Sequence, residues 1–196
     1  MEDVSHQDVG AATNASLTGA IEQLPVEEGD IVVRTLRHTD AEAFALGTKD
    51  PAVRAYGHLP LPDYTSQVVH EQIDGVIADG LADGSLAVLA IADATTDQFL
   101  GSLVLFDVRQ GRAEVGFWLA PEGRGRGAAR KALVAGLTLA RHAGLGLLDA
   151  RTAPENAASL RVLESAGFRQ QGGPVEQETP AGAVVPVLTL QRTVSG

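Results

Sequence analysis

The 196-residue chain is 44% hydrophobic, has no cysteine and carries a formal net charge of −10, which is typical of one folded domain with a sizeable core. Its composition excludes disulfides and thiolate chemistry, and because Asp, Arg or Gly interrupts every apolar run, no stretch reaches the roughly 18 apolar residues of a membrane span. The acidic charge argues against nucleic acid as a partner, and the lack of a secretory leader favours a cytoplasmic protein that binds no membrane.

Residues 1–29 are predicted to form an acidic N-terminal tail ahead of a domain over residues 30–196. Seven of the 25 acidic residues lie within residues 1–30, which contain no Lys or Arg, so 18 acidic residues accompany 15 basic ones in the remainder. Small and polar residues dominate positions 5–19. This composition favours a mobile, solvated arm.

The first half of the domain reads as a strand followed by helices. A β-branched run predicts a strand over residues 31–36. Thr39 and Glu42 have the spacing of a capping box, so a helix is predicted to begin there, and Pro51 ends it or prevents its extension. Residues 56–63 contain two prolines and read as a loop. Apolar residues at helical spacing then predict a second helix over residues 65–81.

The second half begins with extended segments. Short polar connections join those at 86–92, 99–108 and 113–119, which predicts an antiparallel meander. A helix over 128–142 with Gly144 as its C-terminal cap follows, then a strand over 147–152, a short helix over 157–166 and a strand pair from Phe168 to Arg192. Pro186 cannot donate to a ladder, so the last strand is expected to run mainly from Val187, with a bulge or strand start at Pro186. These elements predict one mixed α/β (α+β) domain.

A glycine-rich loop separates the predicted strand at 113–119 from the predicted helix at 128–142. Glycines at 123, 125 and 127 let the backbone approach a ligand closely, and the free amides at the helix start converge on one point. The loop therefore predicts a phosphate site, with a plain glycine turn bearing solvated arginines as the alternative. Four cations lie within eight residues of this acidic chain: Arg124, Arg126, Arg130 and Lys131.

Two other phosphate-binding folds fit the loop less well. Gly123, Gly125 and Ala128 match a Gly-x-Gly-x-x-Ala dinucleotide fingerprint, with Asp149 about twenty residues further on. A dinucleotide fold, however, needs more βα units after the loop and has no place for the meander before it. A P-loop is excluded because no Gly-Lys-Ser/Thr follows the glycines. No spacing of His, Asp and Glu predicts a metal site.

Two motifs resemble the GNAT superfamily. The run Arg124-Gly125-Arg126-Gly127-Ala128-Ala129 is similar to its Arg/Gln-x-x-Gly-x-Gly/Ala acyl-CoA signature. Asn156 and Ser159, followed by Gly167-Phe168, resemble the Asn-x-x-Ser and Gly-Phe block of the RimJ/RimL-like branch. The resemblance implies a GNAT fold, in which a mixed, mostly antiparallel sheet of about six or seven strands has flanking helices and one splayed parallel strand pair. It also implies transfer of an acetyl group from acetyl-CoA to a primary amine, by direct attack in a ternary complex.

The resemblance also implies where acetyl-CoA would bind. The pantetheine arm would lie between the strands at 113–119 and 147–152, and one main-chain amide near residues 117–119 would polarise the thioester carbonyl. The pyrophosphate would contact amides of residues 126–129. Asn156 would hydrogen-bond the pantetheine, cap its own helix, or both. The implied cofactor-binding residues are Phe117, Trp118, Leu119, Arg124, Gly125, Arg126, Gly127, Ala128, Ala129 and Asn156.

The catalytic residues implied are Glu114 and Ser159. Glu114 is the candidate base for the amine, with a salt bridge as its alternative role. Ser159 resembles the serine that supports the leaving thiolate, while Leu163 occupies the position of the tyrosine acid usual in the superfamily. That missing tyrosine keeps a non-catalytic acyl-CoA sensor open as an alternative. Three residues are expected to border the acceptor site: Tyr56, His58 and Tyr64. Expected partners are acyl-CoA, an amine on a protein N-terminus or small molecule, and a second copy of the chain in a homodimer.

Overall fold

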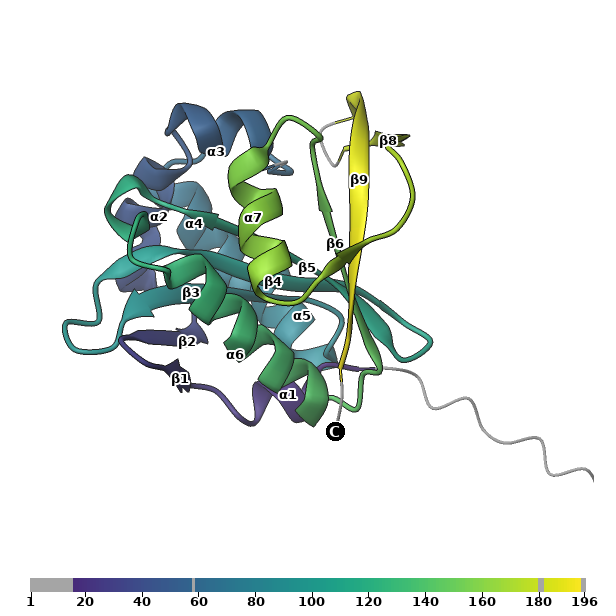
Figure 1. The fold of residues 1–196 in the computed structure, drawn as a ribbon. Coiled ribbons are helices and arrows are strands. Elements are labelled where there is room, and N and C mark those ends of the chain that lie inside the picture. Colours follow the sequence, from purple (N-terminus) through teal and green to yellow (C-terminus); the bar gives the residue numbers. More distant parts are fainter. Residues whose placement is uncertain (1–15, 58, 180–181, 195–196) are drawn as a thin grey trace, which may run out of the picture.

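The computed structural model describes residues 16–57, 59–179 and 182–194. Within these ranges the chain forms a mixed sheet of nine strands with helices on both faces (Figure 1). The strand order is β1-β2-β3-β4-β5-β6-β9-β7, with β8 paired to β9. Every neighbouring pair is antiparallel except β5 and β6. The predicted mixed, mostly antiparallel α/β fold is therefore confirmed.

The sheet exceeds the predicted six or seven strands because three short strands lengthen it. These are β1 (Val26–Glu28), β7 (Arg169–Gln170) and β8 (Val175–Glu178). The longer strands are β2 (Ile31–Thr35), β3 (Ala87–Asp93), β4 (Phe99–Arg109), β5 (Arg112–Leu119), β6 (Leu147–Thr152) and β9 (Val184–Thr193). Strands β3, β4 and β5 form the predicted antiparallel meander.

Seven α-helices flank the sheet within the described ranges. They are α1 (Thr18–Ile21), α2 (Ala41–Gly47), α3 (Pro51–Tyr56), α4 (Ser66–Gln72), α5 (Ala78–Asp83), α6 (Ala128–His142) and α7 (Ala157–Ser165). A π-helical segment, Ile73–Ile77, joins α4 to α5, so the predicted helix over 65–81 is interrupted at its middle. None of these helices is long and apolar enough to cross a membrane.

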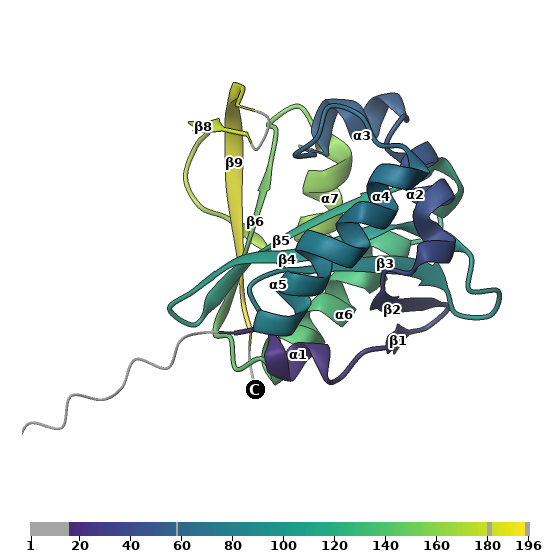
Figure 2. The ribbon, with the colours of Figure 1, turned by 180° about the vertical axis from the view of Figure 1, so that it is seen from behind.

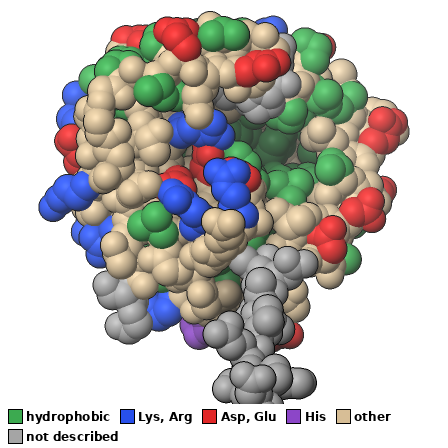
Figure 3. Space-filling model, turned by 90° about the vertical axis from the view of Figure 1, so that its right-hand side faces the viewer, with side chains coloured by type: hydrophobic (Ala, Val, Ile, Leu, Met, Phe, Trp, Pro, Cys, Tyr) green, Lys and Arg blue, Asp and Glu red, His purple; other side chains and the backbone are tan. Residues whose placement is uncertain are grey.

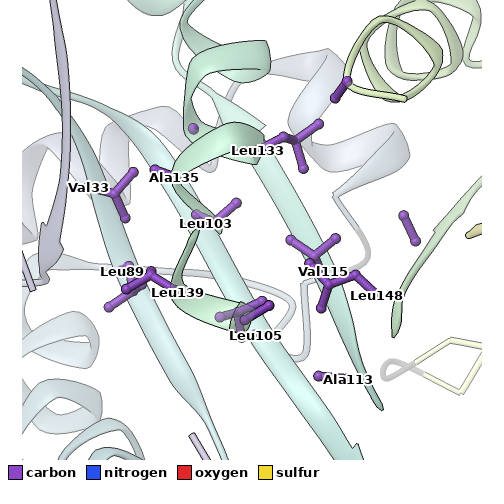
Figure 4. Close-up of a cluster of buried hydrophobic side chains, with 14 of the residues drawn as sticks. Val33, Leu89, Leu103, Leu105, Ala113, Val115, Leu133, Ala135, Leu139 and Leu148 are labelled. Carbon is purple, nitrogen blue, oxygen red and sulfur yellow. The ribbon is translucent and has the colours of Figure 1, made fainter. Parts of the chain in front are cut away.

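The main core lies between α6 and the sheet (Figure 4). Helix α6 places Ala132, Ala135 and Leu139 on one face, where they pack against buried residues of β2 to β6. Helix α1 adds Leu17 and Ala20 to the same cluster. Ala132, Ala135 and Leu139 are three and four residues apart, which is the spacing of one face of an α-helix.

We expect Leu103→Ala to lower the free energy of unfolding by about 3 kcal/mol, because Leu103 is fully buried under α6 and the change leaves a cavity. The melting temperature should then fall by roughly 6–12 °C for a domain of this size. Leu46→Ala is the matched control, since Leu46 is 67% exposed and should change stability by less than about 0.5 kcal/mol. Equal melting curves for the two variants would contradict the packing described.

Helices α2, α3, α4 and α5 cover part of the opposite face of the sheet (Figure 2). An aromatic cluster forms the centre of this second layer. Phe44 of α2 meets Trp118 of β5 edge to face, with ring centroids 5.1 Å apart, and Phe99 of β4 lies 5.8 Å from Trp118. Such contacts fix the helical layer against the strands that lead to the glycine-rich loop.

The fold begins earlier than predicted. The sequence placed residues up to 29 in a mobile tail, but α1 and β1 belong to the folded structure, and β1 pairs with β2. Leu17 is fully buried against α6, and its amide donates to the Gly84 carbonyl at 2.8 Å. The acidic composition of residues 16–29 gave no sign of folding, because a few apolar residues are enough to pack a short helix such as α1 against the core. The rest of the predicted tail, residues 1–15, lies outside the described residues.

The start of α2 also differs from the prediction. No capping box forms between Thr39 and Glu42. Instead, the Asp40 carboxylate accepts the Arg37 amide at 2.8 Å and is held by the buried Arg34 guanidinium at 2.7 Å. Helix α2 ends at Gly47, and Pro51 then opens α3 at its first position, where a missing N–H costs nothing.

The last strand, β9, can contain Pro186 because the proline lies where β9 pairs with β8 alone. Strand β9 begins at Val184, earlier than expected, and Pro186 lies where β9 pairs with β8. Pairing with β6 starts only at Leu188. Proline is therefore kept out of the part of β9 that has strands on both sides, as its missing donor requires.

Candidate active site

Strands β5 and β6 pair for only three residues and then separate. Their parallel register joins Arg112 to Leu147, Ala113 to Leu148 and Glu114 to Asp149. Beyond Glu114, β5 continues to Leu119 beside β4, while β6 continues to Thr152 beside β9. This is the splayed parallel pair that the family resemblance implied.

A cleft of about 1010 Å³ opens at this splay. It is lined by β5, β6, the glycine-rich loop, the first turn of α6 and one side of α7, and it extends over the sheet toward α3, α4 and the π-helical segment that follows α4. Figure 3 shows a hollow on this side of the molecule, where hydrophobic side chains lie next to basic and acidic ones. One continuous space therefore reaches both the α6 N-terminus and the helical layer.

The glycine-rich loop presents the N-terminus of α6 to the cleft. Gly127 is the N-cap of α6 with φ +76°, and no side chain caps the helix. A Cβ added at Gly127 would meet no atom within 4 Å, so the space beside it is open. Ala128 and Ala129 also line the cleft. Uncapped amides of a 15-residue helix, facing an open cleft, form an anion site.

The basic residues of the loop do not all point to this site. The Arg126 guanidinium does not line the cleft and binds the carboxylates of Asp93, at 2.6 Å, and Asp30, at 3.3 Å. Lys131 also binds Asp30, at 2.6 Å. The Arg126 guanidinium holds the pKa of the Asp93 carboxyl well below its usual range. The Arg126 side chain is thus paired with acidic residues outside the cleft, and its role as a cofactor-binding residue stays a prediction.

Two further arginines line the cleft: Arg130, from the basic run around the glycines, and Arg161, which the sequence did not single out. Arg130 is on the first turn of α6, where its Nε donates to the Ser165 carbonyl at 3.3 Å, and Arg161 is on α7. Arg161 lies two residues after Ser159, so the Asn-x-x-Ser motif itself pointed to this helix. These side chains bring positive charge to the mouth of an acidic protein's cleft.

Arg124 links the glycine-rich loop to α3. Its guanidinium binds Asp50 at 2.6 Å and donates to the Leu119 carbonyl at 2.9 Å. Asp50 is also the N-cap of α3, where Oδ1 accepts the amides of Ala52, at 3.0 Å, and Val53, at 3.2 Å. One carboxylate therefore connects the loop to the helix beside the cleft. The Arg124 guanidinium, helped by the two amides, lowers the pKa of the Asp50 carboxyl.

We expect Asp50→Ala to destabilise the protein by about 1 kcal/mol, the usual effect of losing an N-cap, and Asp50→Asn to cost less because an amide oxygen still caps α3. The charge of Asp50 stabilises the fold above its ordinary pKa of 3.8, and this contribution disappears as pH falls through the lowered pKa. Urea unfolding should therefore show wild type and Asp50→Asn converging in acid. A difference that persists or grows in acid would contradict the Asp50–Arg124 pair.

The free edge of β5 presents amides to the cleft. Ala120 donates to the Leu100 carbonyl at 2.9 Å, toward β4. Because backbone groups alternate along a strand, the amides of Leu119 and Phe117 face the opposite edge, where β6 has moved away. Trp118 has its amide on the β4 side and its ring in the aromatic cluster, 7% exposed. Its side chain is a core residue at the edge of the cleft.

Glu114 lies at the last paired position of the β5–β6 seam. It is 9% exposed, and its carboxylate binds the Arg151 guanidinium through two contacts of 2.8 and 2.6 Å. Arg151 also contacts the Gln177 side chain. Burial raises the pKa of Glu114 and the Arg151 charge opposes that shift. Glu114 thus lines the cleft and also forms the salt bridge that the sequence left as its alternative role.

Helix α7 carries Asn156 and Ser159 along the cleft. The Asn156 Oδ1 accepts the Ser159 amide at 3.1 Å, so the capping role of Asn156 is confirmed. Leu163, one turn further on, is buried with 1% exposure and also lines the cleft. An apolar residue thus occupies the position where the superfamily usually has its tyrosine.

The three residues expected at the acceptor site have different positions. Tyr56 is half-buried at the end of α3 and lines the cleft. Tyr64 also touches the cleft but is 3% exposed and packs on Phe44, with ring centroids 5.7 Å apart. Burial raises the pKa of the Tyr64 hydroxyl. Most of Tyr64 therefore belongs to the core, and His58 lies outside the described residues.

Among the residues that the structure describes, no group of three or more His, Cys, Asp or Glu side chains is placed to hold a metal ion.

Comparison with known proteins identifies the family. A family model described as "Acetyltransferase (GNAT) domain" matches residues 30–169. An uncharacterized N-acetyltransferase, p20, from Bacillus licheniformis is 25% identical over an alignment of 175 residues that covers 85% of this chain and 96% of that protein. Mycobacterium smegmatis RimJ, solved with CoA-disulfide, has a TM-score of 0.68 and 24% identity over 83% of this chain and 81% of that chain. Spermidine N-acetyltransferase from Vibrio cholerae, solved with CoA and spermine, has a TM-score of 0.70 and 19% identity over 84% of this chain and 95% of that chain. With the family model covering most of its length, this chain belongs to the GNAT acetyltransferase family.

Proposed function

We propose that the protein transfers an acetyl group from acetyl-CoA to a primary amine by direct attack in a ternary complex. The observation that carries the proposal is the continuous cleft between the splayed strands β5 and β6, which has the uncapped N-terminus of α6 at one end and Glu114 at its floor. An anion site and a buried carboxylate in one cleft suit a phosphate-bearing acyl donor and an amine that must lose a proton.

The residues of the cleft divide between holding the donor and moving protons. The amides of Ala128 and Ala129 would bind the pyrophosphate, with Arg124, Arg130 and Arg161 adding charge nearby. The amides of Phe117 and Leu119 face the splay, where one of them would polarise the thioester carbonyl. Fixed donors of this kind stabilise the charge that develops on the oxygen as the amine attacks.

Two side chains would handle the protons. The amine nitrogen bonds to the thioester carbon and the carbon–sulfur bond breaks. Glu114 would take the proton that the amine loses, and Ser159 or water would donate one to the CoA thiolate. The raised pKa of Glu114 supports this role, since a more basic carboxylate is a better proton acceptor.

The alternative function is an acyl-CoA sensor without turnover, which Leu163 in place of the usual tyrosine favours. Release of CoA thiol, measured with acetyl-CoA and a panel of small amines and N-terminal peptides, separates the two. We expect release that depends on an amine. Binding of acetyl-CoA with no release for any amine would leave the sensor as the better description.

We also propose that the enzyme acts in the cytoplasm and binds no nucleic acid; a cysteine-free chain of net charge −10 supports both. The homodimer stays a prediction, which light scattering at micromolar concentration would check.

A further inference from the structure

The acceptor end of the cleft has an apolar floor. Strand register places Val88, Val104 and Gly116 side by side on β3, β4 and β5, and Phe106 of β4 opposite Glu114. Residues two apart on a strand share a face, so all five side-chain positions lie on one surface, and all line the cleft. A Cβ at Gly116 would lie 3.7 Å from the Phe106 ring, which shows that the ring borders this glycine closely.

The wall of this end is apolar as well. Val76 and Ile77 come from the π-helical segment between α4 and α5, and Leu86 precedes β3. Val76 is 55% exposed, which is unusual for a valine on a packed helical layer. The hydrophobic hollow in Figure 3 lies on this side of the molecule.

Negative charge is scarce along the cleft. Among the described residues that line it, only Glu114 and Glu178 are acidic, whereas Arg124, Arg130, Arg151 and Arg161 are basic. Glu114 is already paired through two contacts with Arg151. Glu178 is on β8, outside the floor and wall described above. A second ammonium group on a polycationic acceptor would therefore lie against an apolar surface with no unpaired carboxylate among the floor and wall residues, which is unfavourable.

We infer that the acceptor is a small primary monoamine with an apolar body, whose chain lies on Val88, Val104, Phe106 and Val76. The inference rests on the proposed function and names its substrate class. It follows from the apolar floor, the exposed valine on the wall and the shortage of unpaired carboxylates in the cleft. A monoamine buries its chain there and leaves no second charge to be accommodated.

Hexylamine and hexamethylenediamine form a matched pair of probes, because they differ only by the ammonium at the far end of the same chain. We expect kcat/KM for hexylamine to exceed that for the diamine about tenfold, since the second charge would lie against an apolar surface with no carboxylate partner. From propylamine to hexylamine, kcat/KM should rise roughly fourfold for each methylene that the floor covers.

A carboxylate placed on the wall should reduce this preference. Val76→Asp should lower the hexylamine-to-diamine ratio about tenfold, by offering the distal ammonium a charged partner. Because Val76 is largely exposed, the substitution should leave the melting curve nearly unchanged. Val184→Asp is the control, since Val184 is 66% exposed on β9 and does not line the cleft; its ratio should equal that of wild type.

Failure of the acceptor inference can be distinguished from failure of the proposed acetyltransferase function. A diamine acetylated as well as hexylamine, or acetylation confined to peptide N-termini, would overturn the inference while leaving amine acetylation in place. A wild-type ratio in Val76→Asp would also overturn it, because the distal end of the acceptor would then lie elsewhere. If wild type acetylates no amine or peptide while binding acetyl-CoA, the proposed function fails and the inference falls with it.

Discussion

Gly127→Val is expected to weaken acyl-CoA binding roughly 100-fold, or about 2.7 kcal/mol, while the protein still folds. Gly127 is the N-cap of α6, and the space that its added side chain would enter is open in the structure. That space is where a phosphate must approach the first amides of the helix, so two methyl groups there would keep the ligand away. Calorimetric titration with CoA measures the loss directly.

The substitution also strains the backbone, and its control must carry the same strain. At φ +76°, valine should cost about 1–2 kcal/mol and lower the melting temperature by several degrees. Gly144 has φ +69°, has no atom within 4 Å of an added Cβ and does not line the cleft. Gly144→Val should therefore destabilise the fold similarly but bind CoA as wild type does. Equal CoA affinities for the two variants would place the phosphates elsewhere.

Glu114→Gln is expected to lower kcat/KM about 100-fold with little change in acyl-CoA affinity. Glu114 lies at the floor of the cleft, whereas the phosphate site is at the start of α6, so the two effects separate. Glutamine keeps the size of the side chain but cannot take a proton from the amine, and loss of a general base costs rate in this range. Steady-state kinetics with hexylamine, combined with CoA titration, measures both quantities.

The rates of wild type and Glu114→Gln should depend differently on pH. Burial raises the pKa of Glu114, so the wild-type rate should fall as pH drops toward that raised pKa, and the variant should lack this decline. The ratio of wild-type to variant rates should be largest between the pKa of Glu114 and that of the amine, near 10, where the carboxylate is charged and the amine protonated. Above the pKa of the amine the ratio should shrink, because neutral amine is then abundant.

Asp149→Asn is the matched control for the structural role of Glu114. Asp149 binds Arg112 with contacts of 2.8 and 2.7 Å across the same β5–β6 seam, but it does not line the cleft. The Asp149→Asn variant should retain nearly wild-type kcat/KM, although it loses the ion pair with Arg112. Equal losses in Asp149→Asn and Glu114→Gln would mean that the seam needs its salt bridges, and a water chain would then have to take the proton of the amine.

Local pattern and short-range spacing predicted the elements that form the cofactor end of the site. The meander, the glycine-rich loop and α6 follow from alternation, turn residues and helical periodicity within about fifteen residues of each other. Asn156 capping α7 follows in the same way, since its partner is three residues along the chain. These parts could be predicted because the interactions that decide them are local.

The surroundings of other residues depend on distant contacts, which local pattern does not show. Arg126 is paired with Asp30, just before β2, and with Asp93 at the end of β3, and neither contact can be read from the sequence around Arg126. Leu17 appeared to lie in a polar tail, yet it packs beneath α6. Tyr64 lies in a loop beside the cleft, and its burial against Phe44 depends on a residue twenty positions earlier in the chain. The floor of the acceptor end could not be predicted either, because strand register brings Val88, Val104 and Gly116 together from three separate strands.

The most direct test of this account is the fate of an isotope-labelled acetyl group supplied as acetyl-CoA together with hexylamine. We expect N-acetylhexylamine carrying the label, in an amount equal to the CoA released, and a rate that falls in Gly127→Val and Glu114→Gln but not in Gly144→Val. Labelled free acetate with unmodified amine would contradict it, because the cleft would then deliver water rather than an amine to the thioester.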